Sequence, residues 1–180
     1  GLKILDGIGT TENLHIFISN RPDDARLGVS GREVPGYTAK IVNDDDSPVA
    51  RGEIGELMVL GQSVTSRYWN LPERSAATLV DGWLRTGDSY YQDEDGYFIC
   101  CGRSDDMLKV GGIWVSPVEI ESRLISHEAV LEAAVVGLTD DDALVKPEAF
   151  IVLAEGHTGS DALIAELQAH CKAGLARYKF

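Results

Sequence analysis

Asp88 and Arg103 are the two side chains whose types and spacing most directly suggest chemistry. Residues 90–91 and 97–101 have the composition of strands, and the turn 93–96 between them ends in glycine, which is typical of a hairpin. Folding about this turn would bring Asp88 and Arg103 side by side. A carboxylate can accept hydrogen bonds from both hydroxyls of a vicinal diol such as ribose, and a guanidinium can donate to hydroxyl or phosphate oxygens. The two residues could equally form a structural ion pair, and the residues alone leave both interpretations open.

The segment 6–12, Asp-Gly-Ile-Gly-Thr-Thr-Glu, is a second place where a ligand could be held. Its glycines would let backbone atoms approach a ligand closely. The carboxylate of Glu12 offers the hard oxygen ligand that Mg²⁺ prefers. Composition alone also allows an ordinary turn between a strand and a loop.

Lys109 is a third candidate because of its neighbours. An exposed lysine is normally only solvated, but this one follows the acidic pair at 105–106 and precedes the two-glycine turn Gly111-Gly112. Metal ligands are not indicated elsewhere. His127, His157 and His170 have no carboxylate or cysteine partner at ligand spacing, so we interpret them as surface residues and predict no zinc site.

The elements that must position the first two candidates are mostly short strands. Hydrophobic patterning predicts strands at 14–18, 34–42 and 56–60. The acidic run inside the loop 43–48 lacks the ligand spacing of a calcium loop, so we interpret it as a solvated turn. Pro72 lies in the first turn of a predicted short helix.

After residue 105 the pattern changes to an alternation of strands and helices. Strands are predicted at 107–110, 113–115, 130–138 and 148–153. An amphipathic helix is predicted over 161–175. We therefore place a domain boundary at 104–106.

A further helix is predicted directly after Ser116, the residue that would cap it. Pro117 takes its first position, and Glu119 completes a capping box. The buried stripe of this helix is predicted to consist of Ile120, Leu124 and Ile125.

Composition narrows the class of protein. The 180 residues carry a formal net charge of −13, and 44% of them are hydrophobic, as in a soluble globular protein. An acidic surface repels phosphate backbones, so no nucleic-acid partner is expected. No apolar run approaches the length of a membrane span and no signal peptide is recognised, so no membrane partner is expected.

Cys100, Cys101 and Cys171 are predicted to be small buried hydrophobic residues in a reducing compartment, which favours a cytoplasmic location.

Four blocks together resemble the adenylate-forming superfamily of AMP-binding enzymes, which includes acyl-CoA synthetases, luciferases and the adenylation domains of peptide synthetases. The blocks are 6–12, 55–73 with its Tyr-Trp-Asn-Leu-Pro-Glu, 83–88 with Arg-Thr-Gly-Asp, and 101–112 with Gly-Arg-Ser-Asp-Asp. The resemblance implies an α+β fold. Residues 1–104 would be the C-terminal part of the large adenylate-binding domain, a mostly-β, barrel-like subdomain. Residues 105–180 would be a small, mobile C-terminal lid domain, here incomplete.

The resemblance implies roles for matching residues on the nucleotide side. Asp88 would grip both ribose hydroxyls while Arg103 assists. Thr11 would contact the nucleotide phosphate and Glu12 would help hold Mg²⁺ on ATP, which makes both candidates for catalysis. The adenine would be lined by Asp6, Gly7 and Ile8. Tyr68 and Trp69 are interpreted as core aromatics rather than ligand contacts.

It also implies roles on the coenzyme A side. Lys109 would assist thioester formation after the small domain rotates about a hinge at Asp105. The glycine turn would let the thiol arm of CoA pass closely. Arg177 and Lys179 could meet CoA phosphates, or they could be solvated cations at a helix end. The residues assigned to CoA are Gly111, Gly112, Arg177 and Lys179.

Within the superfamily, the phrases 6–17 and 102–121 look close to benzoate- and 4-hydroxybenzoate-CoA ligases. There a His-Ile pair lines the pocket near the aryl carboxylate, which makes His15 and Ile16 substrate-pocket candidates. His15 could also be a plain strand histidine. The implied activity joins an aromatic acid to CoA at the expense of ATP, through an acyl-adenylate, releasing AMP and pyrophosphate. ATP, Mg²⁺ and CoA are the implied cofactors, and the resemblance also allows a homodimer.

Two motifs of the superfamily have no counterpart in the 180 residues. These are the phosphate loop, which would precede residue 1, and a C-terminal motif with a catalytic lysine, which would follow Phe180. The chain is therefore expected to be a C-terminal fragment without ligase activity of its own. The alternatives are another acyl-CoA synthetase, an adenylation domain of a peptide synthetase, and a non-catalytic interaction module on the same scaffold.

Overall fold

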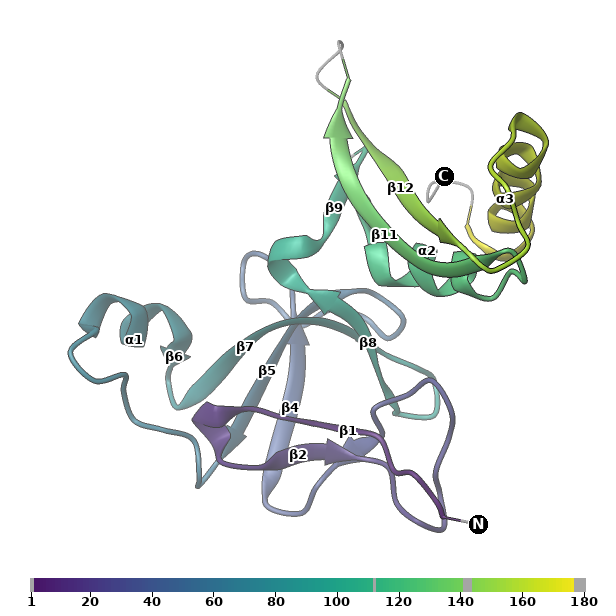
Figure 1. The fold of residues 1–180 in the computed structure, drawn as a ribbon. Coiled ribbons are helices and arrows are strands. Elements are labelled where there is room, and N and C mark those ends of the chain that lie inside the picture. The colour runs from purple at the N-terminus through teal and green to yellow at the C-terminus, as the bar shows by residue number, and fades with distance from the viewer. Residues whose placement is uncertain (1, 112, 141–143, 177–180) are drawn as a thin grey trace. The chain divides into compact units, whose positions relative to one another are not determined.

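The computed structural model describes residues 2–111, 113–140 and 144–176, and its fold is α+β, with three α-helices among many strands in that part of the chain (Figure 1). Contacts between residues divide the chain into two units, Gly1–Ser104 and Asp105–Phe180. The division lies at the junction that the change of sequence pattern indicates. Each unit has a hydrophobic core of its own.

A three-stranded antiparallel sheet begins the first unit. Its strands, in order, are β1 (Gly7–Gly9), β2 (Ile16–Ser19) and β3 (Arg32–Glu33). Between β1 and β2 the chain makes one 3₁₀ turn, η1 (Thr11–Asn13). The strand predicted at 14–18 begins only at Ile16, because Leu14 takes a left-handed backbone conformation with φ of 68°.

A five-stranded antiparallel sheet forms the larger part of the first unit. Its strands are β4 (Tyr37–Val42), β5 (Gly55–Gly61), β6 (Leu79–Val80), β7 (Trp83–Gln92) and β8 (Phe98–Arg103). The order runs β4-β5-β7-β6 with β8 also paired to β7, and it does not close (Figure 1). The described residues thus contain no closed barrel, in contrast to the expected barrel-like subdomain. The short helix α1 (Pro72–Thr78) begins with proline in its first turn, as predicted.

The core of the first unit joins the two sheets. Phe17 and Ile18 of β2 are fully buried and pack in one cluster with Leu57, Leu84 and Tyr90 of the larger sheet. Burial raises the pKa of the Tyr90 hydroxyl, which bonds to Ser30 Oγ at 3.1 Å. This packing holds β1, η1 and β2 against the sheet that carries β7 and β8.

The second unit alternates strands and helices, as its sequence predicts. Its elements are β9 (Leu108–Val110), β10 (Ile113–Val115), α2 (Pro117–Ile125), β11 (Val130–Thr139), β12 (Val145–Leu153) and α3 (Asp161–Gly174). β9 and β10 form one antiparallel hairpin and β11 and β12 another, and α2 contacts both β11 and α3 (Figure 1). The Ser116 hydroxyl accepts the first bond of α2 from the Glu119 amide at 3.2 Å.

Four predictions about burial are wrong. Trp69 is 86% exposed, since it lies in the loop before α1 rather than in a strand. Ile125 is 49% exposed, because it follows Leu124 directly and points about 100° away from the buried stripe. Cys100 is exposed while its neighbour Cys101 is buried, at the point where the pairing of β7 with β8 shifts register. His127 and His170 are not surface residues but half-buried rings stacked edge-to-face 5.1 Å apart.

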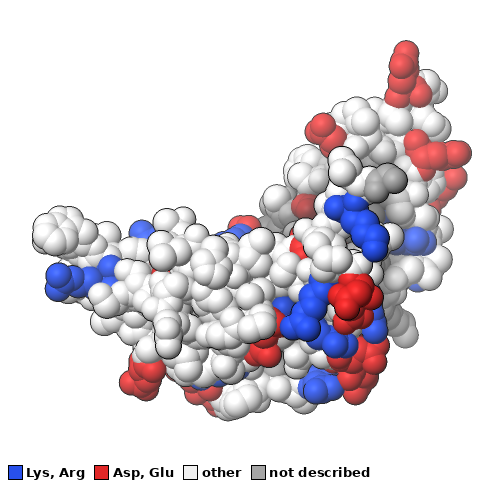
Figure 2. Space-filling model, turned by 90° about the horizontal axis from the view of Figure 1, so that it is seen from below, with Lys and Arg blue, Asp and Glu red and all other residues white. Residues whose placement is uncertain are grey.

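On the face drawn in Figure 2, acidic and basic side chains lie next to one another in several places. A wide uncharged area separates these places. The described residues include no helix that is long and apolar enough to cross a membrane. They also include no group of three or more His, Cys, Asp or Glu side chains that could hold a metal ion.

Candidate functional site

Asp88 and Arg103 are direct partners across the β7–β8 hairpin, as the turn geometry predicts. Arg103 Nη1 donates to Asp88 Oδ1 at 2.8 Å and to the Thr86 carbonyl oxygen at 3.1 Å. The Asp88 side chain is 15% exposed and that of Arg103 is 53% exposed. The carboxylate is therefore largely enclosed, while the guanidinium keeps donors open to solvent or to a ligand.

Gly87 explains why the pair fits here. Its φ of +72° lies in the left-handed region that favours glycine, and a Cβ at this position would lie 2.6 Å from Arg103 Nη2. A side chain would therefore strain the backbone and push the guanidinium away. The hydroxyl of Thr86 fixes the same turn, because Oγ1 accepts from the Asp88 amide at 3.1 Å.

Glu12 lies on η1, which is anchored from several sides. The Thr65 amide donates to the Glu12 carbonyl oxygen at 2.7 Å, and Ser63 Oγ lies 2.9 Å from the carbonyl oxygen of the fully buried Asn13. The Tyr68 hydroxyl donates to Glu12 Oε1 at 2.7 Å. The carboxylate thus stands on a fixed turn, although η1 is only three residues long.

A cavity of about 340 Å³ in the first unit brings Glu12 and Arg103 together. It lies where η1, α1 and the start of β7 meet. Its walls are Thr10, Glu12, Glu56, Tyr68, Arg74, Ala77, Thr78, Leu84, Arg85, Thr86, Gly87 and Arg103. Only Glu12 and Arg103 among these residues are site candidates from the sequence, so most of the cavity wall comes from residues with no predicted role.

The charges around this cavity are largely paired. Arg85 bonds to Glu56 Oε2 at 2.6 Å and also to Asp46, and hydrogen bonding to these two carboxylates raises its pKa. Arg103 is paired with Asp88. Burial, followed by the hydrogen bond to Glu12, raises the pKa of Tyr68, so its phenol remains a neutral hydrogen-bond donor.

The other nucleotide candidates lie on or beside β1. Ile8 pairs with Ile18 of β2, and a Cβ on Gly7 would lie 2.7 Å from the Ile18 carbonyl oxygen. Asp6 is exposed and accepts from the Gly7 amide at 2.8 Å. Thr11 is exposed too, and it does not line the cavity that contains Glu12.

His15 and Ile16, the candidates for an aryl acid, are exposed and do not line that cavity either. His15 Nδ1 lies 2.8 Å from the Ile16 carbonyl oxygen, so this nitrogen carries the proton. Nε2 lies 2.9 Å from the Tyr37 hydroxyl. These contacts hold the imidazole in one orientation beside η1.

In the second unit, Lys109 and Trp114 are partners across the β9–β10 hairpin. The Lys109 ammonium lies 4.9 Å from the centre of the Trp114 ring, within the range of a cation–π interaction. Gly111 has a φ of +56° with open space around it. Asp105 is exposed in the 3₁₀ turn η2 (Ser104–Asp106), at the junction of the units. Three further CoA candidates, Gly112, Arg177 and Lys179, lie outside the described residues.

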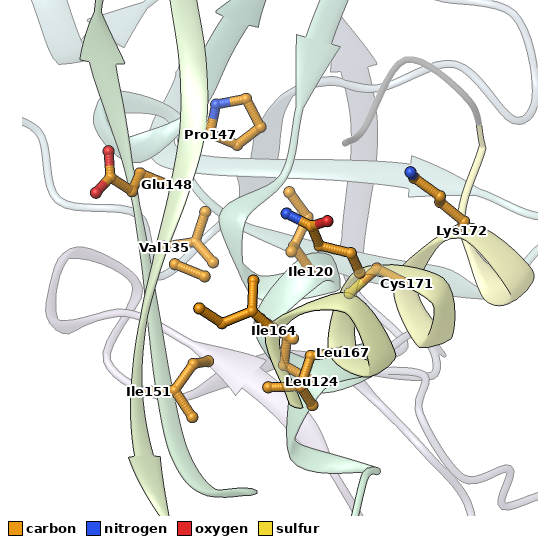
Figure 3. Close-up of a pocket in the computed structure, with 12 residues that line it drawn as sticks. Ile120, Leu124, Val135, Pro147, Glu148, Ile151, Ile164, Leu167, Cys171 and Lys172 are labelled. Carbon is orange, nitrogen blue, oxygen red and sulfur yellow. The ribbon is translucent and has the colours of Figure 1, made fainter. Parts of the chain in front are cut away.

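A different cavity, of about 640 Å³, lies within the second unit between α2, β12 and α3. Apolar side chains such as Leu124, Ile151 and Ile164 point into it (Figure 3). None of the residues that sequence analysis assigns to a site lines this cavity.

The comparisons with known proteins agree with the sequence blocks. The model of the AMP-binding enzyme family matches residues 1–69, and that of the AMP-binding enzyme C-terminal domain matches residues 119–180. Benzoate–CoA ligase of Thauera aromatica is 54% identical over 100% of this chain, and the 4-hydroxybenzoate–CoA/benzoate–CoA ligase of Rhodopseudomonas palustris is 47% identical over the same share.

Solved structures give the same result. The crystal structure of an anthranilate CoA ligase in complex with anthranoyl-AMP matches 99% of this chain with a TM-score of 0.91 and 52% identity. In all three comparisons the chain covers 34% of the relative's own length, so it spans about a third of each of these proteins.

Proposed function

This chain belongs to the AMP-binding enzyme family, and from that premise we propose that it is part of an ATP-dependent ligase that joins an aromatic carboxylic acid to coenzyme A. The observation that carries the proposal is similarity along the whole chain to relatives named as benzoate, 4-hydroxybenzoate and anthranilate CoA ligases. The geometry of Asp88, Arg103 and Glu12 is consistent with a nucleotide site.

In the proposed first step, the carboxylate of the acid attacks the α-phosphorus of ATP, and pyrophosphate leaves. Asp88 accepts hydrogen bonds from the ribose hydroxyls through its carboxylate, while the exposed donors of Arg103 contact the same nucleotide. Thr11 donates to a phosphate oxygen. The adenine lies against Asp6, Gly7 and Ile8.

Glu12 is the residue proposed to meet Mg²⁺. One of its oxygens is held by Tyr68, and the described residues provide no partner for the other. A single carboxylate on a fixed turn suits Mg²⁺, which keeps several waters and is usually held by one or two carboxylates together with substrate phosphates. The ion would supply charge neutralisation on the phosphates.

In the proposed second step, the thiolate of CoA attacks the acyl carbon and AMP leaves. The second unit acts as a mobile lid that rotates about Asp105, and Lys109 then assists from the β9–β10 hairpin. Gly111, with open space around it, lets the thiol arm pass. The same role is proposed for Gly112, and contact with the phosphates of CoA is proposed for Arg177 and Lys179. Rotation at a few backbone bonds is a common way to complete a site between steps.

The aryl group of the acid is proposed to lie near His15 and Ile16. Ile16 is 46% exposed and offers an apolar contact, while the His15 ring is held by the Ile16 carbonyl oxygen and the Tyr37 hydroxyl. Both residues lie directly after η1, so a substrate placed there would be close to the phosphate side of the nucleotide.

The proposal is tested with the full-length protein and a panel of carboxylic acids, by measuring ATP- and CoA-dependent release of pyrophosphate. We expect benzoate, hydroxybenzoates or anthranilate to be the best substrates. An Asp88→Ala variant should bind AMP about 10- to 100-fold more weakly, the value of one or two lost charge-assisted bonds. The 180-residue chain assayed alone should form no acyl-CoA, because it spans about a third of its relatives.

Each other outcome points to a different function. Faster turnover of an aliphatic acid indicates another acyl-CoA synthetase, and adenylation of an amino acid without CoA dependence indicates a peptide-synthetase domain. No pyrophosphate release with any acid, together with AMP binding that Asp88→Ala leaves unchanged, indicates a non-catalytic interaction module.

A further inference from the structure

Tyr68 contacts the candidate metal-binding carboxylate from a distant part of the sequence. Its hydroxyl donates to Glu12 Oε1 at 2.7 Å across a sequence separation of 56 residues. Both side chains line the 340 Å³ cavity that also contains Arg103. The contact is therefore part of the candidate site and not of the hydrophobic core below it.

Two further contacts hold Tyr68 in this place. Its backbone amide donates to Ser75 Oγ of α1 at 2.8 Å. The Arg74 guanidinium carbon lies 4.7 Å from the centre of the Tyr68 ring. Since α1 supplies both partners, the phenol is held by a helix, and its position does not depend on Glu12 alone.

The bond selects one geometry for the carboxylate. The Tyr68 hydroxyl occupies Oε1, and among the described residues no side chain or backbone group bonds to Oε2. The Thr65 amide holds the Glu12 backbone at 2.7 Å, so the remaining freedom of the residue is rotation of its side chain. A hydrogen bond at Oε1 restricts that rotation and leaves Oε2 to a cation.

We propose that Tyr68 is a positioning residue that orients Glu12 for the Mg²⁺ ion of Mg²⁺–ATP. This inference rests on the proposed function, and it adds a residue that the sequence motifs assign only to the scaffold. Partners that hydrogen-bond to metal ligands typically change metal affinity or activity by 10- to 100-fold when they are removed, roughly the range expected here.

The test is Tyr68→Phe in the full-length protein, which keeps the ring and its contact with Arg74 but removes the hydroxyl. Isothermal titration calorimetry without any carboxylic acid measures binding of ATP with Mg²⁺, and separately of AMP without metal. We expect the dissociation constant of Mg²⁺–ATP to rise about tenfold. That of AMP should not change, since AMP binding requires no cation at Glu12.

The matched control is Tyr97→Phe. Tyr97 also lies under arginine side chains and donates its hydroxyl to a backbone oxygen, that of Asp24, but it does not line the cavity. This control should bind both ligands like the wild type. In a Glu12→Gln background, Tyr68→Phe should cause no further loss of Mg²⁺–ATP affinity, because the two residues act as one unit.

Three results would overturn the inference: equal weakening of AMP and Mg²⁺–ATP, no change in either, or an undiminished effect of Tyr68→Phe in the Glu12→Gln background. A wild-type protein that binds neither nucleotide contradicts the proposed function itself. The two failures are therefore distinguishable.

Discussion

At the scale of single residues, the candidate nucleotide site depends on a polar pair that is neither buried nor fully solvated. The Asp88 carboxylate is enclosed, whereas Arg103 is about half exposed. The guanidinium can therefore donate to a ligand, and hydroxyls of a ligand can donate to the carboxylate in its place. Surface ion pairs of this kind contribute little to stability, typically about 0–1 kcal/mol. A role in ligand binding is therefore a better reason for their arrangement than a role in folding.

Gly87 is the residue on which this arrangement most depends. Gly87→Ala should weaken AMP binding by about tenfold or more, because a Cβ would displace the Arg103 guanidinium and weaken its charge-assisted bonds. It should also lower the free energy of unfolding by about 1 kcal/mol, since alanine disfavours a positive φ. Calorimetry with AMP and urea unfolding measure the two effects.

Gly28→Ala separates backbone strain from displacement of Arg103. Gly28 has a similar φ of +77°, but a Cβ there would meet no atom within 4 Å. This variant should lose stability to a similar degree and keep its AMP affinity. Equal AMP affinity in both variants would show that the space beside Arg103 is not needed for binding.

At the scale of elements, the start of α2 is fixed by Ser116, the residue that caps it. Ser116 is 1% exposed, and its hydroxyl accepts from the Glu119 amide, as the capping sequence predicts. Ser116→Ala should therefore lower the free energy of unfolding of the second unit by about 1 kcal/mol, the usual cost of a lost N-cap. Urea unfolding followed by circular dichroism measures the change.

Ser122→Ala is the control for that measurement, because it makes the same substitution at an exposed position inside α2. Alanine favours a helix interior, so this variant should be as stable as the wild type or slightly more stable. A loss as large as that of Ser116→Ala would show that the cap is not the cause.

At the scale of the whole molecule, the division between Ser104 and Asp105 separates the residues proposed for adenylation from those proposed for thioester formation. Asp105→Pro should leave formation of the acyl-adenylate nearly unchanged, because the residues proposed for adenylation lie before the junction. Thioester formation should fall by about 100-fold, since a fixed φ at the hinge would misplace Lys109. Single-turnover assays of each half-reaction in the full-length protein measure the split.

Asp105→Ala removes the carboxylate but keeps backbone rotation, so it should retain both half-reactions. If it loses thioester formation as strongly as Asp105→Pro, the side chain matters and the hinge interpretation is wrong. If Asp105→Pro retains both half-reactions, no rotation at this position is required.

The sequence by itself determined the local features of this protein. The turn at 93–96 and the antiparallel hairpin around it set Asp88 opposite Arg103, because pairing across a hairpin follows from counting residues away from the turn. The Ser116 cap and the glycine turn after Lys109 are equally local. The four motif blocks were enough to indicate the family.

Only the tertiary structure decided which residues surround the candidate site. The contact of Tyr68 with Glu12, the exposure of Trp69 and the stacking of His127 on His170 all depend on how distant segments pack. Hydrophobic periodicity reports which face of an element is buried, but it carries no information about the partner that covers that face. A core position is thus the expectation for Tyr68, whereas the packing of the loop before α1 against η1 places its hydroxyl on the carboxylate of Glu12.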